Sequence, residues 1–245
     1  MAPAGEMDCE ADSEAEEAVM RVMVPLHGLY GRLLRQRQYL ARLFVILLTI
    51  TLSPFSAAWG QAQAVRLLAL GDSLTAGYNL PADAAFPAQL EKALREAGLN
   101  VTAINAGVSG DTSAGALSRL DWSLADKPTH ALVALGANDM LRGLSPENAQ
   151  ANIEKIVTKL QSAGVKVMLV GMLAAPNLGE DYGRRFNALY PALAEKYKLP
   201  LYPFFLDGVA TRRDLTLDDG MHPNRAGVAE MVKRMLPSVT AWLKG

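Results

Sequence analysis

The chain has 245 residues, half of them hydrophobic, and its 24 Lys and Arg nearly balance its 25 Asp and Glu. This length allows one well-buried domain, and the balanced charge, without an arginine-rich run or a basic patch, argues against a nucleic-acid partner. The one cysteine, Cys9, lies near the N-terminus, so we expect neither disulfides nor cysteine catalysis in the folded domain.

Residues 1–64 have the organisation of a leader. Residues 1–20 are acidic and lack aromatic residues, which is typical of a disordered segment. A basic stretch with four arginines then precedes the apolar run 43–52, and small residues follow up to Ala64. This pattern predicts a secretory signal peptide cleaved near residues 60–64, with an uncleaved N-terminal anchor as the alternative. The acidic start is unusual for such a leader and is explained if translation begins at Met20 or Met23.

The predicted leader has consequences for location. We expect an exported protein, periplasmic in a Gram-negative source or otherwise secreted. The apolar run is short and is followed by Pro54, so we expect no stable membrane span in the mature protein.

Strand and helix patterns alternate from residue 65 onward. Short apolar runs bounded by turn residues predict strands at 65–70, 101–104, 130–135, 165–170 and 201–204. Helical periodicity with capping signals predicts helices at 86–97, 113–122, 145–160, 182–197 and 226–243. This alternation predicts an α/β fold, with a five-stranded parallel sheet and helices on both faces, in a single domain of residues 65–245.

Residues able to carry out acyl transfer follow several of these strands. Ser73 follows the first strand, Gly110 the second and Asn138 the third, and a longer loop after the fifth ends in Asp219 and His222. Segments that follow parallel strands emerge at the same edge of the sheet, where open α/β sheets bind ligands. We therefore expect these five residues to lie close together.

The chemistry of acyl transfer assigns a role to each of the five. A serine hydroxyl is a weak nucleophile until a base takes its proton, and His222 is the plausible base for Ser73. Asp219 can turn back and bond the second ring nitrogen of His222, which fixes its tautomer and orientation. The backbone N–H groups of Ser73 and Gly110 and the side-chain amide of Asn138 are the candidate donors to an oxyanion.

Each of these features also has an ordinary structural interpretation. Asp219 is typical of a turn, Asn138 and the following Asp139 are typical of a helix start, and Gly110 is typical of a tight loop. A single histidine before a proline, as at His222, is more often structural than catalytic. Their occurrence together, at one edge of the expected sheet, favours an enzyme.

The segments that carry these residues resemble the four signature blocks of the SGNH (GDSL) hydrolases. They read Gly71-Asp72-Ser73-Leu74, Gly110, Gly136-Ala137-Asn138-Asp139 and Asp219-Gly220-Met221-His222. The resemblance covers essentially all of the chain after the leader and is greatest to the bacterial thioesterase I / lysophospholipase L1 / arylesterase group. Ala137 departs from the pattern, since many members have glycine there.

The resemblance implies a fold and an activity. It implies a three-layer α/β/α sandwich of the flavodoxin-like SGNH type, with Ser73 as nucleophile, Gly110 and Asn138 as oxyanion donors and an Asp219–His222 pair. It implies a hydrolase of carboxylic esters and thioesters. We expect no metal, because the residues after the leader include only two histidines and no cysteine, and no other cofactor. By this resemblance the substrates are small-molecule or lipid acyl compounds, and we expect a monomer.

Apolar residues in the loops after the third and fourth predicted strands are candidates for an acyl groove. They are Met140, Leu141, Leu178 and Tyr182. The alternative is that they pack the loops onto the body of the domain. Three other interpretations of the whole chain also stay open: a carbohydrate O-acetyl esterase of the same family, a non-catalytic lipid- or glycan-binding module, and a cytosolic thioesterase with a mispredicted start.

Overall fold

The computed structural model describes residues 64–245 and four residues of the leader, at positions 36, 37, 39 and 42. Cys9, the apolar run 43–52 of the predicted signal peptide and all of its cleavage region except Ala64 lie outside the described residues. The leader and its cleavage therefore stay predictions. Within the part of the chain that is described, no helix combines the length and the apolar character needed to cross a membrane.

A five-stranded parallel sheet lies at the centre of residues 64–245, in the strand order β2-β1-β3-β4-β5. Its strands are β1 (Val65–Gly71), β2 (Val101–Gly107), β3 (His130–Ala134), β4 (Lys166–Val170) and β5 (Leu201–Tyr202). The inner strands β1 and β3 are buried over most of their length, as expected when helices cover both faces of a sheet. The predicted α/β fold with a five-stranded parallel sheet is confirmed.

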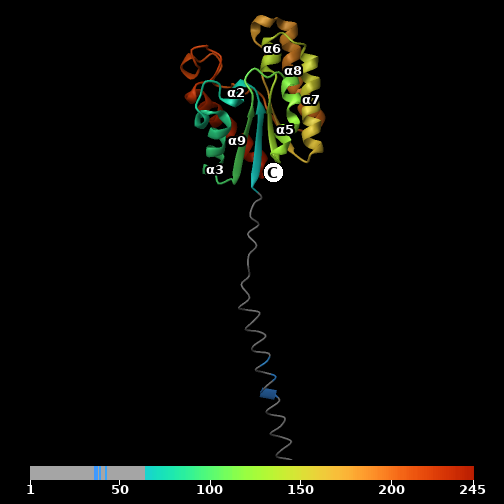
Figure 1. The fold of residues 1–245 in the computed structure, drawn as a ribbon, viewed down its shortest axis with the longest axis vertical. Helices are drawn as coiled ribbons and strands as arrows, with labels where there is room; N and C mark the ends of the chain where they lie inside the picture. The colour runs from blue at the N-terminus through green and yellow to red at the C-terminus, as the bar shows by residue number, and fades with distance from the viewer. Residues whose placement is uncertain (1–35, 38, 40–41, 43–63) are drawn as a thin grey trace, which may run out of the picture. The chain divides into compact units, whose positions relative to one another are not determined.

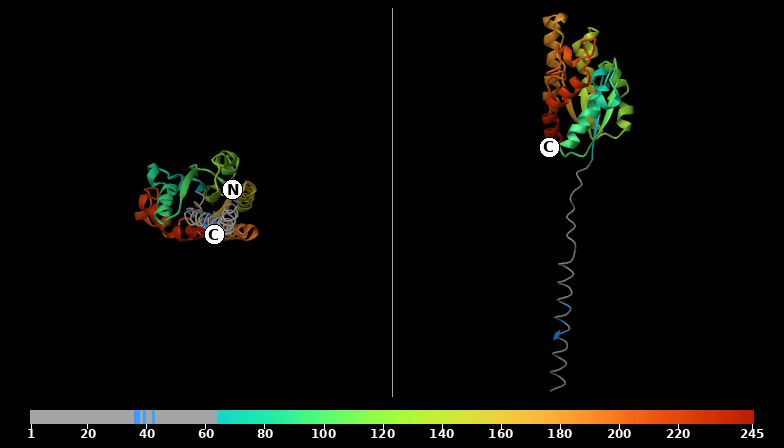
Figure 2. Two further views of the ribbon diagram at one scale, coloured as in Figure 1. Left: turned by 90° about the horizontal axis from the view of Figure 1, so that it is seen from below. Right: turned by 90° about the vertical axis from the view of Figure 1, so that its left-hand side faces the viewer.

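Helices on the two faces of the sheet complete three layers. Figure 1 shows α3 (Phe86–Glu96) and α9 (Arg225–Lys244) on one side, and α5 (Leu120–Ala125), α7 (Pro146–Ser162) and α8 (Glu180–Tyr197) on the other. From the first side, α9 runs beside α3 (Figure 2, right). The shorter helices are α2 (Ser73–Ala76), α4 (Ser113–Ser118) and α6 (Ala137–Leu141), and three one-turn 3₁₀ helices lie at Ala82–Ala84, Pro176–Leu178 and Arg213–Leu215.

The order of the strands decides where a ligand can bind. From β1 the chain goes to β2 on one side and then returns to β3 on the other, so the direction of winding reverses next to β1. Open α/β sheets bind ligands at the carboxyl ends of the strands at such a reversal. Ser73 begins α2 two residues after the end of β1, which places it at this point of the sheet.

The side chains between the sheet and the helices form one apolar core. Phe86 of α3, Leu132 of β3, Ile156 of α7 and Phe186 of α8 are each 1% exposed or less. Burying a side chain of this size contributes roughly 1.5–3 kcal/mol relative to leaving it in water. The core therefore holds the strand ends, and the loops that follow them, in fixed positions.

Several predicted elements differ from the observed ones. The second strand extends to Gly107, three residues beyond its predicted end. The predicted helix at 113–122 is two helices, α4 and α5, which meet at Arg119. Arg119 leaves helical geometry, and its guanidinium donates to Asp111 Oδ2 at 2.6 Å and to the Gly71 carbonyl at 3.1 Å. The fifth strand ends at Tyr202, two residues earlier than predicted, because Pro203 has no N–H to donate to a neighbouring strand.

His130, at the start of β3, makes the stability of the fold depend on pH. It is 9% exposed, its Nδ1 is hydrogen-bonded to Thr129 Oγ1 at 2.9 Å, and its Nε2 is buried without a partner among the described residues. Burial, with a contribution from Lys166, lowers the pKa of His130. The pKa of this histidine in the unfolded chain is about 6.5, so as the pH falls the unfolded chain takes up a proton there before the folded chain does. Lowering the pH therefore decreases the free energy of unfolding.

We therefore expect the melting temperature of the His130→Phe variant to fall less than that of the wild type between about pH 8 and about pH 5.5. Phenylalanine removes the titrating group and keeps a ring beside Trp242, whose ring centroid lies 5.1 Å from that of His130. Thermal melts of both proteins at several pH values measure the effect. Equal decreases in the two proteins would contradict this role for His130.

Candidate active site

Ser73 is held at the carboxyl end of β1 by the first turn of α2. Asp72 caps this helix, since its Oδ1 accepts a hydrogen bond from Leu74 N at 3.0 Å. A Cβ at Gly71 would overlap the side chain of Thr75, and one at Gly107 would overlap the backbone of Ala76. Glycine at these positions therefore allows α2 to pack closely on the ends of β1 and β2. Within residues 64–245 the Ser73 N–H has no hydrogen-bond acceptor, as is normal at the start of a helix.

The loop before α9 brings His222 and Asp219 to Ser73. His222 Nε2 lies 2.9 Å from Ser73 Oγ, and His222 Nδ1 lies 2.7 Å from Asp219 Oδ2. The other carboxylate oxygen of Asp219 accepts from the backbone N–H groups of Met221 at 2.8 Å and His222 at 2.9 Å. This closed turn includes Gly220 with φ of 67°, a left-handed conformation that glycine adopts without strain.

The hydrogen bonds at Asp219 decide the protonation of the pair. The backbone N–H groups of His222 and Met221, and then the imidazole, lower the pKa of Asp219 to about 2. The carboxylate is therefore ionised near neutral pH and can only accept hydrogen bonds. It fixes the proton of neutral His222 on Nδ1, which leaves Nε2 free to accept the proton of the Ser73 hydroxyl.

Gly110 and Asn138 lie at the same cavity as Ser73 and His222. Gly110 has φ of 83°, and among the described residues its N–H has no acceptor, while its carbonyl accepts from Arg142 Nη2 at 2.8 Å. The Asn138 amide donates to the Asp111 carbonyl at 2.9 Å and faces Asp72 Oδ2 at 3.4 Å. The first contact fixes the amide, and the length of the second leaves that N–H available to a better acceptor.

Two buried carboxyl groups support this arrangement. Asp72 is 2% exposed, and burial raises its pKa to about 6, against the opposing effects of the Leu74 N–H and of His222. Asp139 accepts from Ser113 N at 2.7 Å and from Ser113 Oγ at 2.6 Å. Because Asp139 follows Asn138 and Ser113 follows the Gly110 loop, this contact joins the two segments that carry the candidate oxyanion donors.

The cavity beside Ser73 has a volume of about 290 Å³. Of the four residues expected to form an acyl groove, Met140 and Leu141 line it and Leu178 and Tyr182 do not. The Tyr182 hydroxyl donates to the Leu144 carbonyl at 2.9 Å, and Leu178 packs against the core. Leu178 and Tyr182 therefore pack onto the body of the domain and are not part of the groove, which is the alternative interpretation of these residues.

Several residues of the cavity were missed by the sequence reasoning. They are Tyr78, Met172, Leu206 and Met221, which line the cavity with the residues already named. Met172 and Leu206 follow β4 and β5, so the rule that places residues after strands at one edge would have found them. Met221 lies within a signature block and Tyr78 shortly after another, but nothing in their local sequence indicates which way their side chains point.

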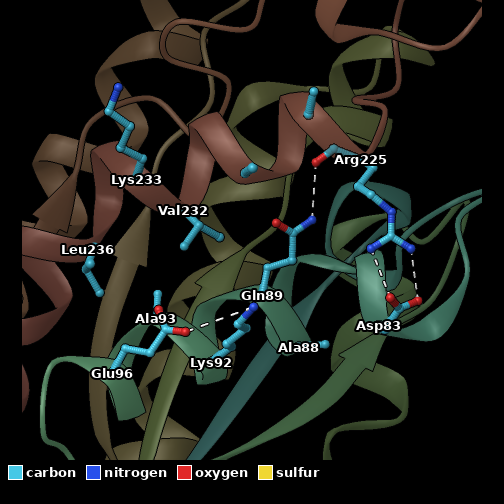
Figure 3. A pocket seen from close by; sticks show the side chains of 12 residues that line it. Asp83, Ala88, Gln89, Lys92, Ala93, Glu96, Arg225, Val232, Lys233 and Leu236 are labelled. Atoms are coloured by element: carbon cyan, nitrogen blue, oxygen red, sulfur yellow. Dashed lines mark hydrogen bonds and ion pairs between the residues drawn. The ribbon is translucent and has the colours of Figure 1, made fainter.

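A larger cavity lies between α3 and α9, away from Ser73, with a volume of about 830 Å³. Figure 3 shows two contacts of its polar side chains: Arg225 binds both carboxylate oxygens of Asp83, and Gln89 donates to the backbone carbonyl of Arg225. Among the described residues that line it there is no serine, cysteine or histidine. It therefore offers neither a serine or cysteine nucleophile nor a histidine base, and the smaller cavity, which holds Ser73 and His222, is the candidate active site.

Comparison with known proteins gives concordant matches. Residues 69–229 match the family described as GDSL-like lipase/acylhydrolase. The chain is 39% identical over 199 residues to an arylesterase of Vibrio mimicus, covering 80% of this chain and 97% of that one. It is 38% identical over 208 residues to the thioesterase 1/protease 1/lysophospholipase L1 of Escherichia coli strain K12, covering 83% and 94%.

The solved structures agree with these matches. AlinE4, an esterase of the SGNH-hydrolase family, is 48% identical, with a TM-score of 0.62 over 74% of this chain and 97% of that one.

Proposed function

Because the chain belongs to the GDSL-like lipase/acylhydrolase family, we propose that it hydrolyses carboxylic esters and thioesters through an acyl-enzyme on Ser73. The observation that carries this proposal is the pair of hydrogen bonds that joins Asp219 to His222 and His222 to Ser73. Ser73 and His222 line a cavity whose wall also includes Gly110 and Asn138. A nucleophile, an oriented base and oxyanion donors are what acyl transfer requires.

The first half of the reaction forms the acyl-enzyme. Ser73 Oγ attacks the carbonyl carbon of the substrate while its proton passes to His222 Nε2, and Asp219 stabilises the resulting imidazolium. The oxyanion of the tetrahedral intermediate accepts hydrogen bonds from the N–H groups of Ser73 and Gly110 and from the Asn138 amide. The carbon–oxygen or carbon–sulfur bond then breaks, and the alcohol or thiol leaves with the proton from His222.

The second half releases the acid. A water molecule attacks the acyl carbon while His222 Nε2 takes its proton, and the same three donors hold the second oxyanion. When this intermediate collapses, the carboxylic acid departs and Ser73 Oγ regains the proton from His222. Every proton that leaves one group is accepted by another, so the enzyme returns to its starting state.

The lining of the cavity favours an apolar acyl group. Aliphatic and thioether side chains of Leu74, Met140, Leu141, Met172 and Leu206 make up much of its wall. Its volume of about 290 Å³ is at the lower end of the range for small-molecule sites. We propose that short and medium acyl chains fit inside it and that longer chains extend beyond its mouth.

Hydrolysis of a series of p-nitrophenyl esters, from acetyl to palmitoyl, tests the proposed function. We expect activity with a maximum at short to medium chains, and no such activity in the Ser73→Ala variant. Activity confined to acetyl esters would instead favour a carbohydrate O-acetyl esterase. A folded protein without any activity that depends on Ser73 would favour a non-catalytic binding module.

Leu141 is expected to influence acyl-chain length. The Leu141→Ala variant should shift its preference toward longer acyl chains, because removing this side chain enlarges the cavity beside Met140. The ratios of kcat/KM between butyryl, octanoyl and lauroyl esters measure the shift. Leu178→Ala is the matched control, since Leu178 lies outside the cavity lining and should leave these ratios unchanged. Unchanged ratios in Leu141→Ala would show that the acyl chain lies elsewhere.

We also propose that residues 1–64 are a leader and that the hydrolase domain, residues 65–245, works outside the cytoplasm as a monomer. The arginine-rich stretch, the apolar run and the small residues before Val65 support export. Peptide mass mapping of protein from a periplasmic or culture fraction tests the cleavage, and peptides from before residue 60 in that fraction would contradict it.

A further inference from the structure

Tyr78 lies against the imidazole ring of His222. The two ring centroids are 4.4 Å apart, the planes are inclined by 34°, and Tyr78 is 40% exposed. Its hydroxyl makes no hydrogen bond to any described residue. Of the described residues that line the cavity, Tyr78 alone carries a benzene ring. His222 contacts this ring, and the Tyr78 side chain lines the cavity.

The local sequence fixes Tyr78 in this position. Gly77 ends α2 with φ of 83°, and Asn79 follows with φ of 54°, so the chain turns sharply on both sides of Tyr78. The Tyr78 N–H donates to the carbonyl of Ser73 at 3.2 Å. The aromatic ring is therefore tied through the backbone to the residue proposed as the nucleophile.

The position of Tyr78 beside His222 bears on how the leaving group of the substrate is bound. The group that protonates a leaving oxygen must lie within hydrogen-bond distance of it, and in the proposed mechanism that group is His222 Nε2. The leaving group therefore departs beside His222, where Tyr78 is exposed. Met221 precedes His222, is 48% exposed and lines the same cavity, so a thioether is also present there.

We propose that Tyr78 and Met221 form a subsite for a planar aromatic leaving group, so that the enzyme selects aryl esters over alkyl esters of the same size. This inference rests on the proposed function and specifies its substrate. An aromatic ring gains from stacking on tyrosine and from contact with a methionine sulfur, beyond what burial of its area provides. A saturated ring of equal size gains only from burial. Met140 and Leu141, which line the same cavity, carry a thioether and an aliphatic side chain and suit the acyl chain.

Phenyl acetate and cyclohexyl acetate are the test substrates, because they share one acyl group and their leaving groups have the same number of carbon atoms. The ratio of kcat/KM for the two esters is measured in the wild type and in Tyr78→Leu. Dividing one ratio by the other cancels the different intrinsic reactivity of the esters. We expect the preference for the phenyl ester to fall by about threefold to tenfold in Tyr78→Leu. Tyr78→Phe keeps the ring and should keep the wild-type preference.

Leu141→Ala is the crossed control. It should alter the preference for acyl length and leave the preference for phenyl over cyclohexyl unchanged, whereas Tyr78→Leu should do the reverse. An equal loss for both esters in Tyr78→Leu would show that Tyr78 only positions His222, and an unchanged preference would show that the leaving group lies elsewhere. Either result would overturn the subsite. It would leave the proposed function standing as long as hydrolysis of cyclohexyl acetate still depends on Ser73.

Discussion

The His222→Ala variant is expected to hydrolyse p-nitrophenyl butyrate at least about a thousandfold more slowly than the wild type. His222 Nε2 is the base hydrogen-bonded to Ser73 Oγ, at 2.9 Å, and without it the hydroxyl keeps its proton during attack. Steady-state kinetics at equal concentrations of folded protein measure the effect.

The matched control for this variant is His130→Phe. His130 is a buried histidine at the start of β3, at the amino ends of the strands, whereas Ser73 lies at their carboxyl ends. Its replacement should leave kcat near the wild-type value at neutral pH. A loss of less than tenfold in His222→Ala would show that another group takes the proton of Ser73.

The Asn138→Ala variant is expected to lose about a hundredfold to a thousandfold in kcat with a much smaller change in KM. The amide is proposed to bind the oxyanion, which exists only in the transition state and the intermediates, so its removal raises the barrier more than it weakens substrate binding. Kinetics with p-nitrophenyl butyrate measure both constants.

Folding of this variant is checked by thermal melting. Loss of the hydrogen bond from Asn138 to the Asp111 carbonyl costs about 0.5–1.5 kcal/mol, so the variant should still fold. Asn148→Ala, which removes an exposed amide from α7, is the matched control and should behave as the wild type. Wild-type kcat in Asn138→Ala would exclude Asn138 from the oxyanion site.

Much of the fold and the central residues of the site follow from patterns that are local in the sequence. Apolar runs such as 65–70 and 130–135 mark the buried strands, and parallel strands place the residues that follow them at one edge. This rule alone brings Ser73 together with residues that lie far from it in the chain. The turn that lets Asp219 reach His222 is also local, since the two residues are three positions apart and Gly220 lies between them.

Other features depend on contacts that sequence patterns do not record. Helices α2 and α6 have four and five residues, which is too short for a periodic signal. The break at Arg119 is associated with its contacts to Asp111 and Gly71, and Gly71 lies 48 residues away. Asp139 is typical of a helix start, yet the structure buries it against Ser113, so its role is set by packing between two loops.

The residues of the cavity also show that sequence patterns do not predict the direction of individual side chains. Met140, Leu141, Leu178 and Tyr182 have similar apolar character and all follow strands in the sequence, but only the first two line the cavity. The direction of each side chain depends on the contacts that its segment makes with the rest of the domain. Tyr182 is turned to the Leu144 carbonyl by its hydroxyl, an interaction that composition and spacing do not predict.

Covalent labelling of Ser73 tests the central claim most directly. The purified protein is incubated with a fluorophosphonate, which reacts with activated serine hydroxyls, and digested for peptide mass spectrometry while residual esterase activity is followed. We expect one phosphonyl group on the peptide that contains Ser73, in proportion to the activity lost, and no label in Ser73→Ala or His222→Ala. Label on a different residue, or wild-type ester hydrolysis by Ser73→Ala, would contradict the account.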